Sequence, residues 1–203
     1  MLAAQYPYRD RGLGRTGMAA PLTTRRFTVD EYHRMAEAGI LTEDDQVELL
    51  DGQIVPMSPI GSHHAGCVNR LTALFTHAAG NAVTVSVQNP VVLGRHYEPQ
   101  PDLAVLRYRA DGYGARLPEA ADVLLVIEVT DTTTDRDRER KIPVYARAGI
   151  PEAWLVDLTA DRIEVHREPT GGDYTQVTTV GRGAALTALA LPGIRVSVDE
   201  ILG

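Results

Sequence analysis

The sequence of 203 residues contains a single cysteine, Cys67, and aromatic residues make up only 5% of it. One cysteine cannot form an internal disulfide or a zinc site built from several cysteines. No apolar run approaches the roughly 18 residues that a membrane-spanning helix needs, and the start of the chain lacks the apolar core of a secretory signal. We therefore expect a protein of the reducing cytoplasm with no membrane partner.

Positive charge is also scarce. The chain has 20 lysines and arginines against 27 aspartates and glutamates, so its formal net charge is -7. Because nucleic-acid affinity depends on neutralised phosphates, this balance argues against strong non-specific binding across the whole surface. It is still compatible with a local basic patch, or with a site where metal ions neutralise phosphate.

Two common site motifs are missing. The glycine-rich stretch GLGRTG has neither a preceding strand nor the Lys-Ser/Thr ending of a phosphate-binding loop. His63 and His64 are adjacent, which is not the spacing of a zinc-protease helix. Nucleotide-binding loops and zinc proteases are therefore not indicated.

The chain divides near residue 25. Residues 1–25 lack hydrophobic periodicity, so we expect a flexible N-terminal tail, whereas residues 26–203 have the length of one ordinary domain with a sizeable core. Asp51-Gly52 is a strong signal for a type I′ hairpin within residues 46–57. Helix patterns cover 28–39, 62–80 and 133–149. Strand patterns cover 82–94, with a turn near Asn89-Pro90, and 101–108, 122–130, 152–158, 162–168 and 174–180. Residues 193–202 have the pattern of a strand followed by a short helical turn.

The order strand, helix, strand over Val123–Val156 is typical of a βαβ unit. We therefore predict an α/β (α+β) fold, with one central mixed β-sheet that is flanked by helices and carries extra β-hairpins. No internal repeat and no second domain is indicated.

Three carboxylates lie in apolar, strand-like surroundings: Glu48, Asp102 and Glu128. Glu128 is the hardest to explain structurally, because Val123–Val129 has the pattern of a strand that is buried on both faces. An unpaired carboxylate in such a strand costs several kcal/mol. For Glu48 the alternative is an exposed position before a hairpin, and for Asp102 it is a turn formed with Pro101.

A shared cation explains several such acids at once. Hard divalent ions such as Mg²⁺ bind one or two carboxylates together with water and substrate phosphate, and they activate water and stabilise charge on the phosphate. Lys141 lies one turn before Tyr145 on the predicted helix and borders its apolar side. From there its ammonium could reach the end of the Glu128 strand and orient a water or stabilise transition-state charge. The neighbouring arginines are typical of a solvated helix face.

Three stretches resemble one known family: ELLDGQIVPMSPIGSHHAGCVNRL, PQPDLAVL and LLVIEVTDTTTDRDRERKIPVYARAGIPEAWLVD. The chain has a Pro-Asp dipeptide, an acid in the next core strand and a later lysine. This order resembles the motif of the PD-(D/E)XK nuclease superfamily. More narrowly, the three stretches in this order resemble the Uma-two family of bacterial proteins named as restriction endonucleases. The resemblance covers Phe27 to Leu202, so residues 26–203 are identified as a PD-(D/E)XK nuclease-like domain.

The resemblance implies a restriction-endonuclease-like core and an endonuclease that hydrolyses phosphodiester bonds of DNA with Mg²⁺, or with Mn²⁺. It makes Asp102 the aspartate of the Pro-Asp motif, Glu128 the acid of the second motif and Glu48 an acid from the hairpin region. All three are implied as catalytic residues and metal ligands. The common motif has its lysine two positions after the second acid, where this chain has Thr130, and Lys141 is the matching lysine.

Two further residues belong to the expected site. His64 matches a histidine in the family's corresponding segment and is counted as catalytic, the alternative being a solvent-facing residue at the start of a helix. Gln88 is expected to line the site.

Other functions stay open at this point. A binding module on the same fold, with little or no nuclease activity, fits the low basic content and the threonine at position 130. A pair of glycosidase carboxylates plus a spare acid is a third hypothesis, although 5% aromatic residues offer few platforms for sugar stacking. Two-fold symmetric cutting of DNA would need a homodimer.

Overall fold

The computed structural model describes residues 24–42, 44–131 and 134–203, and over 134–139 it describes the backbone alone. The expected N-terminal tail therefore lies almost entirely outside the described residues and stays a prediction. None of the described helices is long and apolar enough to cross a membrane.

A six-stranded mixed sheet forms the centre of the fold, in the order β3-β4-β5-β6-β7-β8. β5 and β6 run parallel, and every other neighbouring pair is antiparallel. The strands are β3 (Val83–Val87), β4 (Leu103–Arg107), β5 (Val123–Thr130), β6 (Glu152–Asp157), β7 (Arg162–Thr170) and β8 (Asp173–Gly181). The mixed central sheet that the sequence predicts is confirmed.

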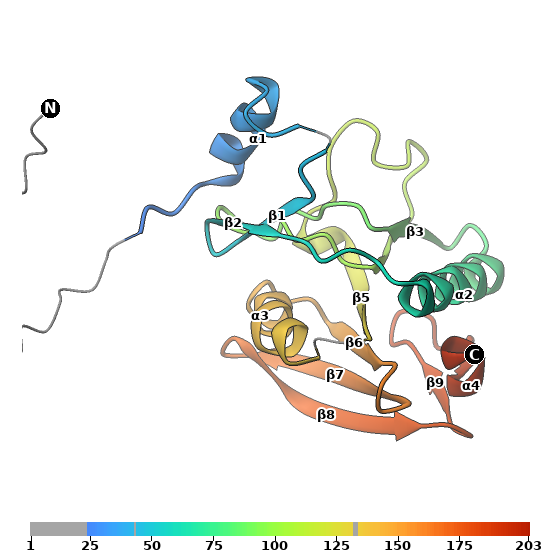
Figure 1. Ribbon diagram of the computed structural model, residues 1–203. Coiled ribbons are helices and arrows are strands. Elements are labelled where there is room, and N and C mark those ends of the chain that lie inside the picture. Colours follow the sequence, from blue (N-terminus) through green and yellow to red (C-terminus); the bar gives the residue numbers. More distant parts are fainter. Residues whose placement is uncertain (1–23, 43, 132–133) are drawn as a thin grey trace, which may run out of the picture.

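Helices cover both faces of this sheet (Figure 1). α2 and the short α4 pack against one face, and α3 packs against the other. The helices are α1 (Val29–Glu37), α2 (Ser62–Ala79), α3 (Thr134–Arg147) and α4 (Val198–Leu202). α3 joins the parallel strands β5 and β6, so the βαβ unit expected over Val123–Val156 is confirmed.

β5 is buried on both sides, as its apolar run predicts. Its side chains alternate between the two cores: Ile127 and Val129 pack on the α2 side, and Val126 packs on the α3 side. The same alternation directs Glu128 to the α3 face. Any partner that compensates the buried charge of Glu128 is therefore expected on α3.

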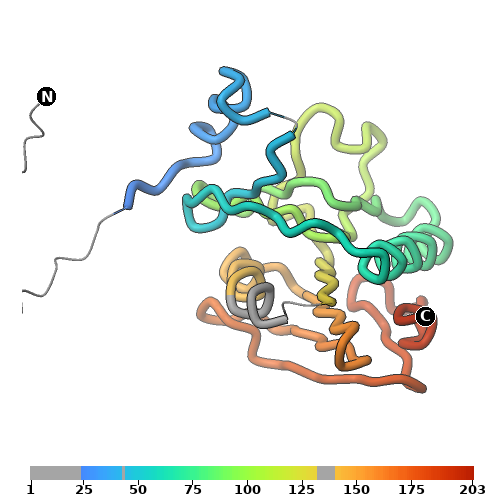
Figure 2. The backbone as a smooth tube through the Cα atoms, in the orientation of Figure 1, coloured from blue at the N-terminus to red at the C-terminus, as the bar shows by residue number. Residues whose placement is uncertain are grey.

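A separate hairpin, β1 (Val47–Leu50) and β2 (Gln53–Pro56), lies between α1 and α2 along the chain, and Figure 2 shows this path. Asp51 and Gly52 have φ values of 52° and 71°, so the predicted type I′ turn is confirmed. The backbone of Leu49 pairs with that of Glu98, which attaches the hairpin beside the segment that leads into β4. The hairpin can therefore deliver Glu48 to the start of β4.

The helix ends follow their sequence signals closely. Thr28 caps α1 and forms a capping box with Glu31, and Gly80 follows the last residue of α2. Two short elements were not predicted, the three-residue strand β9 (Ala185–Thr187) and the 3-10 turn Ala120–Asp122. β9 pairs with β10 (Arg195–Ser197), which lies within the predicted strand and turn at 193–202.

Candidate active site

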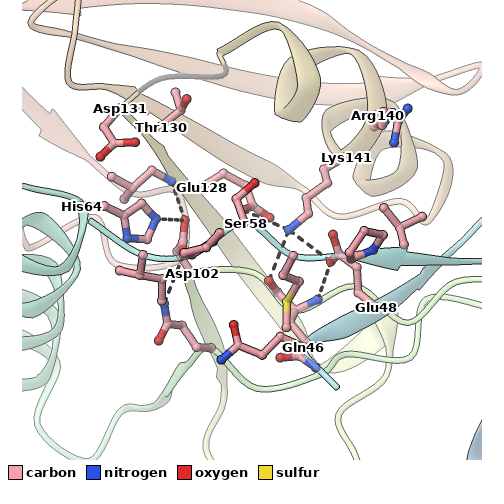
Figure 3. Close-up of a pocket in the computed structure, with 18 of the residues that line it drawn as sticks. Gln46, Glu48, Ser58, His64, Asp102, Glu128, Thr130, Asp131, Arg140 and Lys141 are labelled. Atoms are coloured by element: carbon pink, nitrogen blue, oxygen red, sulfur yellow. Dashed lines mark hydrogen bonds and ion pairs between the residues drawn. The ribbon is translucent and has the colours of Figure 1, made fainter. Parts of the chain in front are cut away.

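A pocket of about 420 Å³ lies where the end of β5, the segment before β4, the β1–β2 hairpin, the start of α2 and the middle of α3 meet. All five predicted catalytic residues line it: Glu48, His64, Asp102, Glu128 and Lys141. Gln88 and Thr130 line it as well. Figure 3 shows the acidic side chains and Lys141 grouped in this pocket. The structure therefore brings the predicted site together, while the roles of the individual residues stay predictions.

Asp102 is held from two directions, just before β4 begins. One carboxylate oxygen, Oδ2, accepts a hydrogen bond from the Val129 backbone N–H at 2.8 Å and lies 3.0 Å from His64 Nε2. His64 is in the first turn of α2, and its side chain is largely buried against Asp102. His64 therefore contacts Asp102 from the start of α2, and its catalytic role stays a prediction.

Gln88 approaches the other side of Asp102. Its amide nitrogen lies 3.5 Å from Asp102 Oδ1, the upper limit for a hydrogen bond, and its backbone N–H donates to the Asp102 carbonyl at 3.2 Å. Gln88 has a φ of 50°, which is uncommon for a residue other than glycine. Such backbone strain persists where the surroundings impose it, and functional sites are one such place. Gln88 therefore lines the pocket beside Asp102.

Glu128 is only 2% exposed, and α3 supplies partners to both of its carboxylate oxygens. Lys141 Nζ lies 3.4 Å from Oε2, and the Tyr145 hydroxyl donates a hydrogen bond to Oε1. Lys141 and Tyr145 are one helical turn apart, so they point to the same side of α3. α3 therefore contacts the Glu128 carboxylate through two side chains and fixes its orientation.

Tyr145 has a polar role that the sequence does not indicate. The side chain is completely buried, and its pKa is raised well above the usual tyrosine value by that burial and by the adjacent negative charge of Glu128. The phenol therefore stays protonated and remains a donor to Glu128. A buried aromatic at this helix position has the same sequence pattern as an ordinary core residue, so the pattern alone could not reveal the hydrogen bond.

Lys141 connects Glu128 with the hairpin. Its ammonium lies 3.2 Å from Glu48 Oε2 and also donates to the Gln100 carbonyl at 3.3 Å. Glu48 in turn accepts from the Gln100 backbone N–H at 3.1 Å. One buried ammonium therefore joins β1, β5 and the segment before β4, and Figure 3 shows Lys141 between the two glutamates.

The amino-acid composition also distinguishes Lys141 from the other basic residues. Lys141 is the only lysine in the chain, so the other 19 of its 20 basic residues are arginines. An ammonium is a compact point charge with three rotatable donors, whereas a guanidinium is a planar fork. The one place where the chain uses an ammonium is the contact with two buried carboxylates.

The donor set of the pocket fits a hard divalent cation. Glu48, Asp102 and Glu128 bring three carboxylates, and Asp45 and Asp131 also line the pocket. Lys141 and Arg140 compensate only part of this charge. Carboxylate oxygens are ligands that Mg²⁺ and Mn²⁺ prefer. Within the described part of the chain, no group of three His, Cys, Asp or Glu side chains is gathered closely enough to enclose a metal. Mg²⁺ does not require such a cage, because it usually binds one or two carboxylates and keeps several waters.

A cation bound at Glu128 would lose a well-oriented ligand when the Tyr145 hydroxyl is removed. Mn²⁺ binding would then weaken about 10-fold, the lower end of the range for a group that orients a metal ligand. Tyr145→Phe keeps the ring in the α3 core but leaves one oxygen of Glu128 without its donor. Tyr174→Phe is the matched control, since Tyr174 is buried on the same face and donates to the Ile150 carbonyl at 2.8 Å outside the pocket. Calorimetric titration with Mn²⁺ measures both variants, and equal affinities would contradict an orienting role for Tyr145.

The fold and the pocket together define a restriction-endonuclease-like protein: a mixed sheet between helices, with an acidic pocket beside the strand that carries Glu128. The model of the Uma2 family, described as "Putative restriction endonuclease", matches residues 29–199. The chain therefore belongs to the Uma2 family, and the resemblance seen in the sequence is confirmed.

A solved structure supports the fold. The crystal structure of "a putative nuclease belonging to DUF820" from Anabaena variabilis is similar with a TM-score of 0.69 and 14% sequence identity. The similarity covers 87% of this chain and 97% of that chain. No curated protein matches the sequence.

Proposed function

We propose that this protein is a Mg²⁺-dependent endonuclease that hydrolyses phosphodiester bonds in DNA, with Mn²⁺ able to replace Mg²⁺. The observation that carries the proposal is the meeting of Asp102, Glu128 and Lys141 in one pocket, from the residue before β4, from β5 and from α3. Membership of a family described as restriction endonucleases and the fold of a nuclease neighbour support the same class of activity.

Each residue has a defined task in this proposal. Asp102 and Glu128 would hold the metal, with Glu48 as a further or water-mediated ligand. A bound Mg²⁺ supplies positive charge that stabilises the phosphate in the transition state and acidifies a bound water. Lys141 is anchored by Glu48 and would orient the attacking water and stabilise developing negative charge.

The remaining groups keep the acids in place. His64 and the Val129 N–H hold Asp102, and Tyr145 holds Glu128. In the reaction, the water oxygen bonds to phosphorus while the bond from phosphorus to the leaving sugar oxygen breaks. The water gives up its proton to solvent, and the leaving oxygen takes one up.

Cleavage of supercoiled plasmid by wild type and by Asp102→Asn tests this function. Asparagine keeps an oxygen that accepts from the Val129 N–H, but it loses the charge for a cation, so cleavage is expected to fall at least about 100-fold. Asp111→Asn is the matched control, because Asp111 pairs with Arg109 outside the pocket lining and should cut like wild type.

A binding module on the same fold is the second candidate, favoured by the threonine at position 130 and the net charge of -7. A binding module would cut neither plasmid, single-stranded DNA nor RNA. It would still bind Mn²⁺, and the Asp102→Asn substitution would weaken that binding. That result would overturn the nuclease proposal and retain the metal site.

A further inference from the structure

β8 forms one edge of the central sheet. The sheet order places β3 and β8 at the two edges, and β7 pairs with β8 along its length. Across the described ranges, no other strand pairs with β8. Figure 1 shows β8 running along the border of the molecule, with β7 on its inner side. β8 spans nine residues, against five for the opposite edge strand β3.

The chemistry of β8 lacks the usual protection of an edge strand. Natural sheets discourage edge-to-edge pairing with charged side chains, proline, bulges or very short strands. Between Asp173 and Gly181, β8 reads YTQVTTV, with no charge and no proline. Most of its side chains are exposed, and Val177 at its centre is 53% exposed. Residues 174–180 of β8 are therefore uncharged and mostly β-branched, which favours pairing with another strand.

We propose that β8 is a homodimer interface, in which β8 of a second copy of this chain pairs with it in antiparallel orientation. The pairing would join the two six-stranded sheets into one continuous sheet. A two-fold axis places the strand against itself, so the interface is self-complementary. Because residues 174–180 carry no charge, no like charges meet across the axis, and Thr and Val pairs stabilise antiparallel strands.

A second copy suits this edge better than an unstructured segment does. β8 is already folded as a strand in each copy, so pairing does not require the ordering of a flexible chain, which would weaken binding. The proposal does not depend on nuclease activity. It would, however, give the protein the two-fold symmetry that a symmetric cut of two strands needs.

The expected dimer is weak and salt-dependent. One added strand pair buries less surface than the roughly 1,200–2,000 Å² of a stable interface, so we expect a dissociation constant on the order of tens of µM. Each copy has a net charge of -7, so the two copies repel at low ionic strength. Added salt screens this repulsion and should tighten the dimer.

Analytical ultracentrifugation from about 1 to 500 µM, a range that brackets the expected constant, tests the interface. Val177→Lys and Val177→Glu place like charges near the two-fold axis, and each should weaken the dimer at least 10-fold. The two variants shift the net charge in opposite directions, so a common loss cannot come from overall charge. Val177→Thr and Ile40→Lys, the latter at a 69% exposed apolar position outside the sheet, should dimerise like wild type.

Hydrogen exchange of the wild-type protein provides a second readout that needs no variant. Amides on the outer side of β8 should become protected as concentration rises, because they gain hydrogen bonds only in the dimer. A protein that stays monomeric over the whole range would overturn the proposal. So would a dimer whose affinity in both charged variants equals that of wild type, or one that protects segments other than β8.

Discussion

Replacing Lys141 by methionine is expected to abolish cleavage and to make the stability of the protein depend on divalent cations. Methionine is similar in length but carries no charge, so it removes the ammonium that lies between Glu48 and Glu128. A group that orients water or stabilises transition-state charge contributes about 100- to 1,000-fold or more, so we expect a loss of about 1,000-fold in single-turnover cleavage.

The effect on stability has the same origin. The two glutamate side chains are 6% and 3% exposed, and without Lys141 they would be buried carboxylates that lose their shared cation. Breaking a buried ion pair in this way costs about 3–5 kcal/mol of unfolding free energy. Mg²⁺ that binds only the folded state stabilises it by mass action. Unfolding in urea with and without Mg²⁺ should therefore show a larger gain for Lys141→Met than for wild type.

Lys141→Arg separates charge from shape. The arginine keeps a positive charge in the pocket, so the variant should fold more stably than Lys141→Met. Its planar guanidinium cannot reproduce the compact contacts at 3.2 and 3.4 Å to the two carboxylates, so cleavage should still be low. Full activity in Lys141→Met would show that this lysine serves only the fold.

The single lysine also offers a direct chemical test of its position. Amine-directed reagents can modify only Lys141 and the N-terminal amine in this chain. Reductive methylation with ¹³C-formaldehyde would therefore place one internal NMR probe in the pocket. A shift of that resonance on addition of Mg²⁺ is expected because Lys141 contacts Glu128, a proposed ligand.

Much of the fold could be predicted because its signals are local. A few neighbouring residues are enough to predict the turn at Asp51-Gly52, the cap at Thr28 and the buried strand β5. β9 escaped prediction because three residues give too short a pattern, and its pairing with β10 depends on the tertiary fold. The site residues were found by a different route, as polar exceptions in apolar surroundings and by the family resemblance.

The partners of the buried acids could not be predicted in the same way. Glu128 and Glu152 are both buried in strands of the central sheet, but the sequence pattern singled out only Glu128. In the structure Glu128 lines the pocket, whereas Glu152 is held by Arg167 and is not part of the pocket lining. Whether a buried carboxylate serves chemistry or structure depends on residues brought close by the fold.

Replacing Glu152 by alanine is therefore expected to damage the fold without touching the pocket. The carboxylate is fully buried and accepts hydrogen bonds from Arg167 Nε and Nη2 at 2.8 and 2.6 Å, from Trp154 Nε1 at 2.9 Å and from the Leu189 backbone N–H at 2.7 Å. These contacts tie β6 to β7 and to the segment after β9. The Glu152→Ala substitution leaves all of these donors without the carboxylate. A Glu152→Gln substitution would retain one acceptor oxygen.

Glu152→Ala should lower the free energy of unfolding by about 3 kcal/mol, the lower end of the range for a broken buried ion pair. The loss is at the lower end because the Arg167 side chain is 25% exposed and can regain water. Trp154 is the only tryptophan and bonds directly to Glu152, so its fluorescence follows urea unfolding at the affected place. Arg182→Ala removes an exposed ion pair with Asp161 and should cost at most about 1 kcal/mol. Equal losses in the two variants would contradict the structural role of Glu152. Unchanged Mn²⁺ affinity in folded Glu152→Ala would show that Glu128 and Glu152 serve separate purposes.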